Sequence, residues 1–293
     1  MSEISETHTD QACQFDCEGD TLYGVLSLPP KIQMPGILIL VGGAQYRAGS
    51  HRQFTMLARA FAAQGIAAMR FDCRGMGDSE GAPRSFDQLD ADIRCAIDHF
   101  MQAAPDLPGV VLWGLCDGAS AALLYARHDH RVKGLALVNP WARTEAGLAQ
   151  AYLRHYYIAR LFSKELWLKV LRGKFNVAAA VGSLFKQVAS AAGLRRDKSP
   201  ATTAQDTRAL PDRMLDGYTQ FDGPVLQILS GQDLTAREFA DLAVAGSAWA
   251  TALGDDRSSR LDLPDANHTF SSKAWRQQVA ERTVQWLRSI SSV

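Results

Sequence analysis

The stretch GVVLWGLCDGAS, from Gly109 to Ser120, decides the fold that the sequence predicts. Residues 109–113 are short, apolar and β-branched, which is typical of a buried parallel strand. The Ala- and Leu-rich residues 119–126 favour a helix. Between them, residues 114–118 match the G-x-nucleophile-x-G pattern of a sharp strand-to-helix turn, with the sulfur of Cys116 in place of a hydroxyl. Glycines fit both sides of such a turn because it leaves no room for a Cβ atom there.

Short apolar runs alternate with helical patterns along most of the chain. After two opening strands within residues 13–28, hinged at residues 18–20, the predicted strands cover residues 36–41, 66–71, 109–113, 132–138, 224–229 and 260–263. Predicted helices cover residues 51–64, 119–126 and 273–290, and another begins at a capping box of Ser85 and Gln88 and runs to about Met101. This alternation predicts an α/β protein with a mostly parallel, eight-stranded sheet and helices on both faces.

The segment from residue 142 to residue 221 does not follow the alternation. It contains aromatic and basic helical patterns, and between residues 143 and 198 eleven Lys or Arg stand against three acidic residues, a net charge of +8. We therefore predict a helical cap at residues 142–221, inserted after the sixth strand, with residues 1–141 and 222–293 forming the core. There are no internal repeats and no low-complexity tract.

Composition excludes several classes of function. The 293 residues carry 31 Lys or Arg and 31 Asp or Glu, and this zero net charge argues against nucleic acid as a general partner. No apolar run approaches the roughly 20 residues of a transmembrane helix, and the polar N-terminus lacks the features of a signal peptide, so we expect a cytoplasmic protein without a transmembrane segment. The five cysteines lack the spacing of zinc ligands, so no metal is expected.

A second segment, Gly77-Asp78-Ser79-Glu80-Gly81, matches the same nucleophile pattern literally. It begins several residues after its strand, and Pro83 interrupts the chain before the next helix. Acidic neighbours on both sides of Ser79 also do not help a nucleophile. We therefore interpret this loop as a tight structural turn.

Three of the predicted strands are each followed by a candidate catalytic residue: a nucleophile, an acid and a base. The order Cys116, Asp233, His268 is the order of nucleophile, acid and histidine that one large class of hydrolytic sites uses. Because the carboxyl ends of parallel strands meet at one edge of a sheet, we expect the three side chains to converge there. His268 would act as general base, and Asp233 would orient its imidazole. Asp265, three residues before His268, is the alternative acid.

An acyl-transfer site also needs donors for the oxyanion and a pocket for its substrate. We expect one donor to be the backbone N–H of Asp117 and the other to be that of Ala44 or Gly43. A thiolate is intrinsically nucleophilic, and its acyl product is a reactive thioester, which favours activated substrates or acyl transfer. The residues expected to line the substrate pocket are Gln45, Tyr46, Arg47, His51, Trp141, Tyr152 and Tyr156.

The chain resembles the α/β-hydrolases over nearly its whole length. More closely, it is similar to the type 1 exosortase A system-associated hydrolases in the segments VGGAQYRAGSHRQF, RFDCRGMGDSEG, WGLCDGASAALLYA, LVNPWARTEAGLAQAYLRHYY and ANHTFSS. The resemblance implies a bacterial cytoplasmic enzyme encoded near exopolysaccharide and protein-sorting genes, and it supports the triad positions. The chain departs from common α/β-hydrolases at Gly42, where many members have a histidine, and this departure bears on the oxyanion geometry.

Three hypotheses for function follow. The first is a cofactor-free acyl hydrolase or acyltransferase of thioesterase character, which works through an acyl-Cys116 intermediate on a small or carrier-bound acyl substrate. The second is a catalytically silent protein whose basic cap binds an anionic partner, such as an acyl carrier protein, or the surface of a membrane. The third is a redox-sensing cysteine, for which the sequence places no resolving cysteine nearby.

Overall fold

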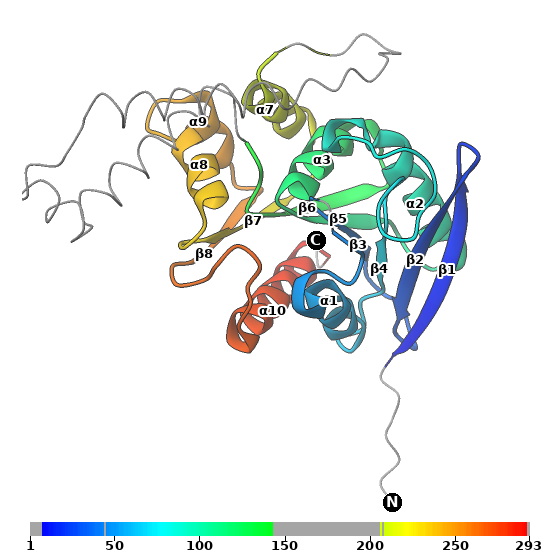
Figure 1. Cartoon of the computed structure of the whole chain (residues 1–293). Coiled ribbons are helices and arrows are strands. Elements are labelled where there is room, and N and C mark those ends of the chain that lie inside the picture. The colour runs from blue at the N-terminus through cyan, green and yellow to red at the C-terminus, as the bar shows by residue number, and fades with distance from the viewer. Residues whose placement is uncertain (1–7, 44, 143–205, 207, 292–293) are drawn as a thin grey trace, which may run out of the picture. The chain divides into compact units, whose positions relative to one another are not determined.

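The computed structural model describes residues 8–43, 45–142, 206 and 208–291. In this part of the chain eight strands form one sheet in the order β1-β2-β4-β3-β5-β6-β7-β8 (Figure 1). β1 pairs with β2 and β2 with β4 in antiparallel orientation, and all other neighbours are parallel. The prediction of a mostly parallel, eight-stranded sheet is confirmed.

The elements lie close to the predicted positions. The strands are β1 (Thr9–Cys17), β2 (Asp20–Leu28), β3 (Gly36–Leu40), β4 (Ala68–Phe71), β5 (Val110–Leu115), β6 (Val132–Val138), β7 (Val225–Ser230) and β8 (Ser258–Leu263). The α-helices are α1 (Gln53–Ala62), α2 (Asp90–Ala103), α3 (Asp117–Tyr125), α7 (Leu210–Gln220), α8 (Leu234–Leu242), α9 (Ala248–Leu253) and α10 (Lys273–Ile290). Short 3₁₀ turns are η1 (Ser50–Arg52), η2 (Phe86–Gln88) and η3 (Ala126–His128). The sequence predicted neither α8 nor α9.

Helices cover both faces of the sheet. On one face, α1 and α10 bury residues such as Phe61 and Leu287 against β3, β5 and β7. On the other face, α2, α3 and α7 to α9 bury residues such as Phe100, Leu123 and Phe239. Figure 1 shows α1 and α10 side by side on one side of the sheet, with α2 and α3 on the other. Because both faces are covered, the central strands are apolar throughout and not alternating.

The predicted capping box at Ser85 and Gln88 is wrong. The Ser85 hydroxyl donates to the Asp87 carboxylate, and no side chain caps the helix that follows. The reason is the intervening turn η2, which ends at Gln88 and moves the start of α2 to Asp90. A capping box needs its Glu or Gln inside the first turn of the helix, and Gln88 lies before it.

The boundary of the predicted cap is also too late. α7 belongs to the same compact unit as the sheet, which comprises residues up to Ala142 and from Leu210 onward. Met214 and Tyr218 of α7 are fully buried, and Gly217 approaches α3 so closely that a Cβ atom would lie 2.5 Å from the Leu123 carbonyl oxygen. Residues 210–221 therefore pack as part of the core. Most of the remaining predicted cap, residues 143–205, lies outside the described residues.

Candidate active site

Cys116 lies in the sharp turn between β5 and α3. Its backbone has φ 61° and ψ −126°, a conformation that L-residues rarely adopt and that stores strain. A Cβ atom on Gly114 would lie 2.4 Å from the Gly118 carbonyl oxygen, and one on Gly118 would lie 2.5 Å from the Leu40 carbonyl oxygen. Only glycine fits at these two positions. The local sequence thus enforces a turn that presents the Cys116 side chain at the end of the strand.

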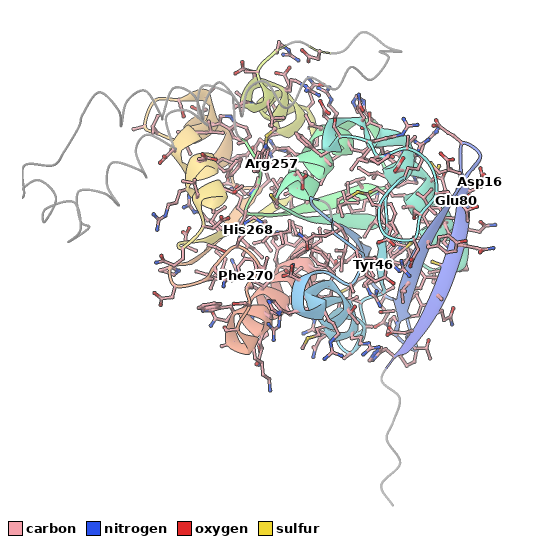
Figure 2. All side chains as sticks on the ribbon, in the orientation of Figure 1. Asp16, Tyr46, Glu80, Arg257, His268 and Phe270 are labelled. Carbon is pink, nitrogen blue, oxygen red and sulfur yellow. The ribbon has the colours of Figure 1, made fainter. Side chains whose placement is uncertain are left out.

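The structure brings Cys116, Asp233 and His268 together. Nδ1 of His268 lies 2.8 Å from Oδ2 of Asp233, and the Cys116 side chain lies near enough to the His268 ring to affect its pKa. Asp233 is held in place as the N-cap of α8, where its carboxylate accepts the backbone N–H groups of Thr235 and Ala236, each at 3.2 Å. His268, labelled in Figure 2, belongs to the loop between β8 and α10. The histidine therefore lies between a carboxylate and a thiol.

The electrostatic setting favours the protonated form of His268. The hydrogen bond to Asp233 makes the largest contribution, the neighbouring Cys116 side chain the next, and together they raise the pKa of His268 to about 10. Burial acts in the opposite direction and is outweighed. At neutral pH His268 is an imidazolium that can donate a proton on either side of its ring.

Asp265, the alternative acid, is exposed in the turn that follows β8. Nδ1 of His268 is hydrogen-bonded to Asp233, which is buried, so the carboxylate at the imidazole is that of Asp233. The sequence left open which of the two carboxylates lies at the imidazole, and in the structure it is that of Asp233.

Sequence reasoning missed Asn139, which lies between the strand ends of the site. It is fully buried at the end of β6 with φ 45°. Its Nδ2 donates to Oγ of Ser230 at 3.0 Å and to the carbonyl oxygen of His268 at 3.1 Å, and its Oδ1 accepts the Ser230 N–H at 2.8 Å. Asn139 therefore ties β6, β7 and the His268 loop together. An asparagine between an apolar strand and a proline, Pro140, was the signal that could have found it.

One predicted oxyanion donor is occupied by the side chain of Asp117. The Gly43 N–H donates to Oδ1 of Asp117 at 2.5 Å. Burial nevertheless raises the pKa of Asp117 above its usual value. Ala44, the alternative donor, lies outside the described residues.

The absence of a histidine at position 42 has a steric reason. A Cβ atom on Gly42 would lie 2.1 Å from the Leu115 carbonyl oxygen and 2.4 Å from Oδ1 of Asp117. The Asp117 carboxylate and the turn backbone together fill the space that a side chain at position 42 would need. The sequence departure at Gly42 is thus coupled to the residue after the nucleophile.

The loop after β3 places several predicted pocket residues in structural roles. Arg47 forms ion pairs with Asp72 and Asp78, and its guanidinium lies 4.3 Å from the centre of the Tyr46 ring. Tyr46 is 45% exposed (Figure 2), and His51 is exposed in η1. Arg47 is therefore engaged by the loop after β4.

The other predicted pocket residues divide into three cases. The backbone N–H of Trp141 donates to the Cys116 carbonyl oxygen at 3.2 Å, and its own carbonyl oxygen accepts the Ser120 hydroxyl at 2.6 Å, so Trp141 lies beside the turn. Oε1 of Gln45 is buried and has no hydrogen-bond partner among the described residues. Tyr152 and Tyr156 lie outside those residues.

Ser79 is a structural residue, as the sequence predicts. Its Oγ accepts the Tyr23 N–H at 3.0 Å and donates to the Asp72 carbonyl oxygen at 2.7 Å. The following Glu80 carboxylate accepts the Thr21 N–H at 2.9 Å. The loop that carries Ser79 is therefore pinned to β2.

The parallel sheet and the strained turn that presents Cys116 define an α/β-hydrolase. The chain belongs to the family described as serine aminopeptidase, S33, whose model matches residues 33–244. Our chain carries a cysteine, Cys116, at the nucleophile position of the G-x-nucleophile-x-G pattern.

Known proteins with similar sequences or folds carry the names of esterases and transferases. A polyketide transferase, grgF of Penicillium sp, is 33% identical over 92 residues, which are 29% of this chain and 30% of that protein. The crystal structure of α/β hydrolase GrgF from Penicillium sp. sh18 has a TM-score of 0.62 at 16% identity and covers 97% of this chain and 100% of that chain. The esterase Pf2001 of Pyrococcus furiosus has a TM-score of 0.64 at 12% identity and covers 99% of this chain and 94% of that chain.

No helix in the described residues combines the length and the apolar character needed to cross a bilayer. Within the same residues, no three His, Cys, Asp or Glu side chains gather as a metal site would require.

Proposed function

We propose that this α/β-hydrolase is a cofactor-free acyl hydrolase or acyltransferase that works through an acyl-Cys116 intermediate. The observation that carries the proposal is the position of His268, which is hydrogen-bonded to Asp233 and lies beside Cys116 at the strained turn. Membership of a hydrolase family supports the reaction class. The name of the Penicillium relative, a polyketide transferase, supports transfer beside hydrolysis.

In the first half-reaction the thiolate form of Cys116 attacks the acyl carbonyl carbon and forms a tetrahedral intermediate. Because the pKa of His268 is raised to about 10, the imidazolium holds the proton that the leaving group needs. Collapse of the intermediate breaks the bond to the leaving group, which takes that proton, and leaves a thioester on Cys116. Neutral His268 then accepts a proton from water or another acceptor, whose oxygen or nitrogen attacks the thioester and releases Cys116.

The Gly43 oxyanion donor requires a rearrangement of Asp117. The Gly43 N–H, which would stabilise the oxyanion, donates to the Asp117 carboxylate in this structure. Burial raises the pKa of Asp117 and so favours its neutral form, which accepts this bond less strongly. We propose that the Asp117 side chain leaves the Gly43 N–H when an acyl substrate enters.

The nature of the nucleophile favours activated acyl groups such as thioesters. A thiolate is intrinsically nucleophilic, and its acyl product remains reactive toward a second acceptor. The motif resemblance implies exopolysaccharide- and exosortase-linked metabolism in a bacterial cytoplasm, and we include this setting in the proposal.

The direct test is detection of the acyl-enzyme by intact mass. The purified protein would be mixed with a panel of acyl thioesters, and we expect a mass increase of one acyl group on the peptide that contains Cys116. Cys116→Ala should show none, and Cys95→Ala should acylate like the wild type. Acylation that persists in Cys116→Ala, or no acylation and no turnover with any member of the panel, would contradict the proposal.

The basic segment supports a second candidate function, binding of an anionic carrier or a membrane surface. Between residues 143 and 198 the net charge is +8. Reversal of Arg154, Arg160 and Lys164 to Glu should raise KM for a carrier-bound acyl substrate and spare a small soluble thioester, because charge attraction acts over a Debye length of roughly 8 Å. Equal effects on both substrates would remove carrier docking. Binding to anionic vesicles without turnover of any acyl substrate would favour the silent binding protein.

A further inference from the structure

The central sheet ends in two edge strands, β1 and β8, and no described residue pairs with the outer side of either strand (Figure 1). An edge strand offers unpaired backbone N–H and C=O groups to any strand that approaches it. Proteins either block such an edge, often with charges, or use it to bind another strand. The charges of β1 and β8 differ, and this difference indicates which edge can accept a partner.

The charges of β1 oppose association with a second copy of the same strand. β1 contains two acidic residues, Asp10 and Asp16, and no basic residue. Asp16 is exposed (Figure 2), and like charges that face each other across two strands are destabilising. A second β1 strand would bring acids to acids, so this edge is protected.

In β8 alternate residues turn their backbone groups away from β7. The Val225 N–H donates to the Arg257 carbonyl oxygen at 2.9 Å, which fixes the parallel ladder between β7 and β8. Because successive backbone groups of a strand point to opposite sides, the odd-numbered residues of β8 bond to β7 and the even-numbered residues face the open edge. Arg260 and Asp262 therefore direct their N–H and C=O groups outward.

The side chains of these two residues carry opposite charges on one face of the strand. The guanidinium of Arg260 donates to the Asp262 carboxylate at 2.8 Å, and the two side chains remain 45% and 55% exposed. An exposed ion pair of this kind contributes little to the stability of a single chain. It is, however, self-complementary. In an antiparallel pair of β8 strands centred on Leu261, each Arg260 lies opposite an Asp262 of the other copy.

We propose that two copies of this chain associate through their β8 strands and join their sheets into one. The strands run antiparallel about a two-fold axis at Leu261, where the two half-buried leucine side chains meet. Arg260 and Asp262 of one copy exchange backbone hydrogen bonds and ion pairs with Asp262 and Arg260 of the second copy. A shift of the register by two residues in either direction would place like charges opposite each other, so the charges select this register. The proposal does not depend on acyl chemistry at Cys116.

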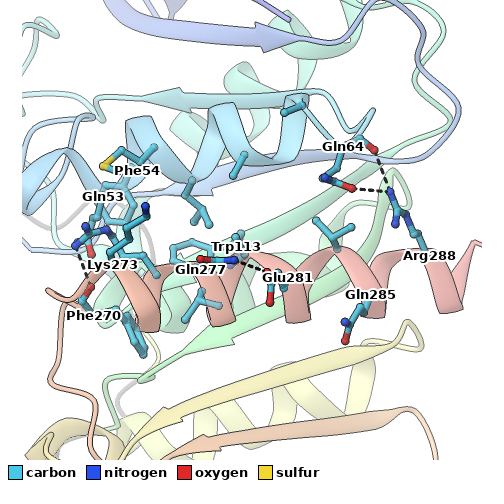
Figure 3. Close-up of a pocket in the computed structure, with 18 residues that line it drawn as sticks. Gln53, Phe54, Gln64, Trp113, Phe270, Lys273, Gln277, Glu281, Gln285 and Arg288 are labelled. Atoms are coloured by element: carbon cyan, nitrogen blue, oxygen red, sulfur yellow. Dashed lines mark hydrogen bonds between the residues drawn. The ribbon is translucent and has the colours of Figure 1, made fainter. Parts of the chain in front are cut away.

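The first experiment is sedimentation equilibrium of the full chain over a series of concentrations. We expect the wild type to form a species of twice the chain mass of 32.0 kDa. Arg260→Glu and Asp262→Arg each turn both cross-strand attractions into repulsions, so each should raise the Kd of the dimer at least about tenfold. Lys273→Glu is the control, because it makes the same change of charge in the groove between α1 and α10 (Figure 3). It should associate like the wild type.

Mixtures of the variants test the register and separate lost pairing from misfolding. Arg260→Glu and Asp262→Arg should form a mixed dimer when combined in equal amounts, because two acids on one strand then face two bases on the other. The double variant Arg260→Glu/Asp262→Arg should dimerise like the wild type, because it restores opposite charges at both pairs. A wild type that stays monomeric at high micromolar concentration, single variants that associate like the wild type, or a mixture that stays monomeric would each overturn the proposal.

Hydrogen exchange locates the contact on β8. As the concentration rises, the backbone amides of Arg260 and Asp262 should exchange more slowly, because they become hydrogen-bonded to the second copy. The amides of Ser259 and Leu261, which face β7, should change much less. Slow exchange of Arg260 and Asp262 at every concentration would show that another segment of the same chain covers the edge. That result, or protection at β1 in place of β8, would refute the β8 dimer.

Discussion

Two loops of this molecule match the same five-residue pattern, and they differ in nearly every physical respect. Residues 77–81 lie in the loop after β4, whereas residues 114–118 run from the end of β5 into the start of α3. In the first loop the two glycines, Gly77 and Gly81, take positive φ values of 53° and 87°, whereas in the second the central residue Cys116 takes one, 61°. The Ser79 hydroxyl makes two hydrogen bonds to backbone groups, and the Cys116 side chain instead faces His268.

The difference shows where a reactive side chain can arise in such a sheet. Strain at Cys116 lifts its side chain away from the backbone, and α3 begins at the next residue. The Ser79 hydroxyl accepts the N–H of Tyr23 in β2, so it is already engaged in a structural hydrogen bond. A side chain in such a turn can act as a nucleophile only if the backbone does not bind it and a histidine lies beside it. The five-residue pattern specifies neither condition.

The largest expected difference between the two loops appears when the central side chain of each is removed. Cys116→Ala should lower kcat by about 10⁴- to 10⁶-fold, as removal of a nucleophile does. Ser79→Ala should keep its activity and lose about 1–3 kcal/mol of stability, because the Tyr23 N–H loses its buried acceptor. Steady-state kinetics on an acyl thioester and thermal unfolding measure the two effects. A folded Ser79→Ala protein without activity would reverse the assignment.

The second test asks whether Asp233 is the acid that orients His268. Asp233→Asn should keep the fold and lower kcat by about 10⁴-fold, because the amide no longer holds the imidazole in the required tautomer. Asp265→Asn is the matched control and should behave like the wild type, since Asp265 is exposed in the turn after β8. Inactive Asp265→Asn together with active Asp233→Asn would transfer the role to Asp265.

The pKa of His268 distinguishes the two loops without a substrate. The pKa of His268 is raised from 6.5 to about 10, so its protonation stabilises the fold fully below about pH 6.5, and this contribution disappears as the pH rises through about 10. In NMR titrations both Asp233→Asn and Cys116→Ala should lower this pKa, Asp233→Asn by more, because its hydrogen bond is the largest cause. Ser79→Ala should leave it unchanged. A His268 that titrates near 6.5 in the wild type would refute the pairing.

Asn139 should give the smallest effect. Asn139→Gly keeps the backbone at φ 45° without strain and removes the amide that bonds to the His268 carbonyl oxygen. We expect kcat to fall on the order of ten- to a hundredfold with KM nearly unchanged, because the imidazole is less well positioned. Ser230→Ala is the control, since it leaves the bond from Asn139 to His268 in place. A lower Tm with no change in kcat would make Asn139 a structural residue only.

Much of the fold could be predicted from local patterns. The bounds of β6 and α10 match the predicted ranges, because an apolar run and an amphipathic period are local signals. The chain order of Cys116, Asp233 and His268 was also readable, because each residue follows a strand and parallel strands end at one edge. The start of α2 was not predicted, because the turn η2 precedes it. The assignment of α7 to the core was not predicted either, because it depends on the packing of Met214 and Tyr218.

By itself the sequence determined the alternation of strands and helices, the glycines that force the turn at Cys116, and the three residues that could meet there. Only the tertiary structure decided which carboxylate bonds to His268, that Asn139 connects β6, β7 and the histidine loop, and that Asp117 occupies the Gly43 amide. The reason is physical. A strand or a turn depends on residues a few positions apart, whereas these hydrogen bonds join residues 35, 129 and 74 positions apart and exist only once the sheet has assembled.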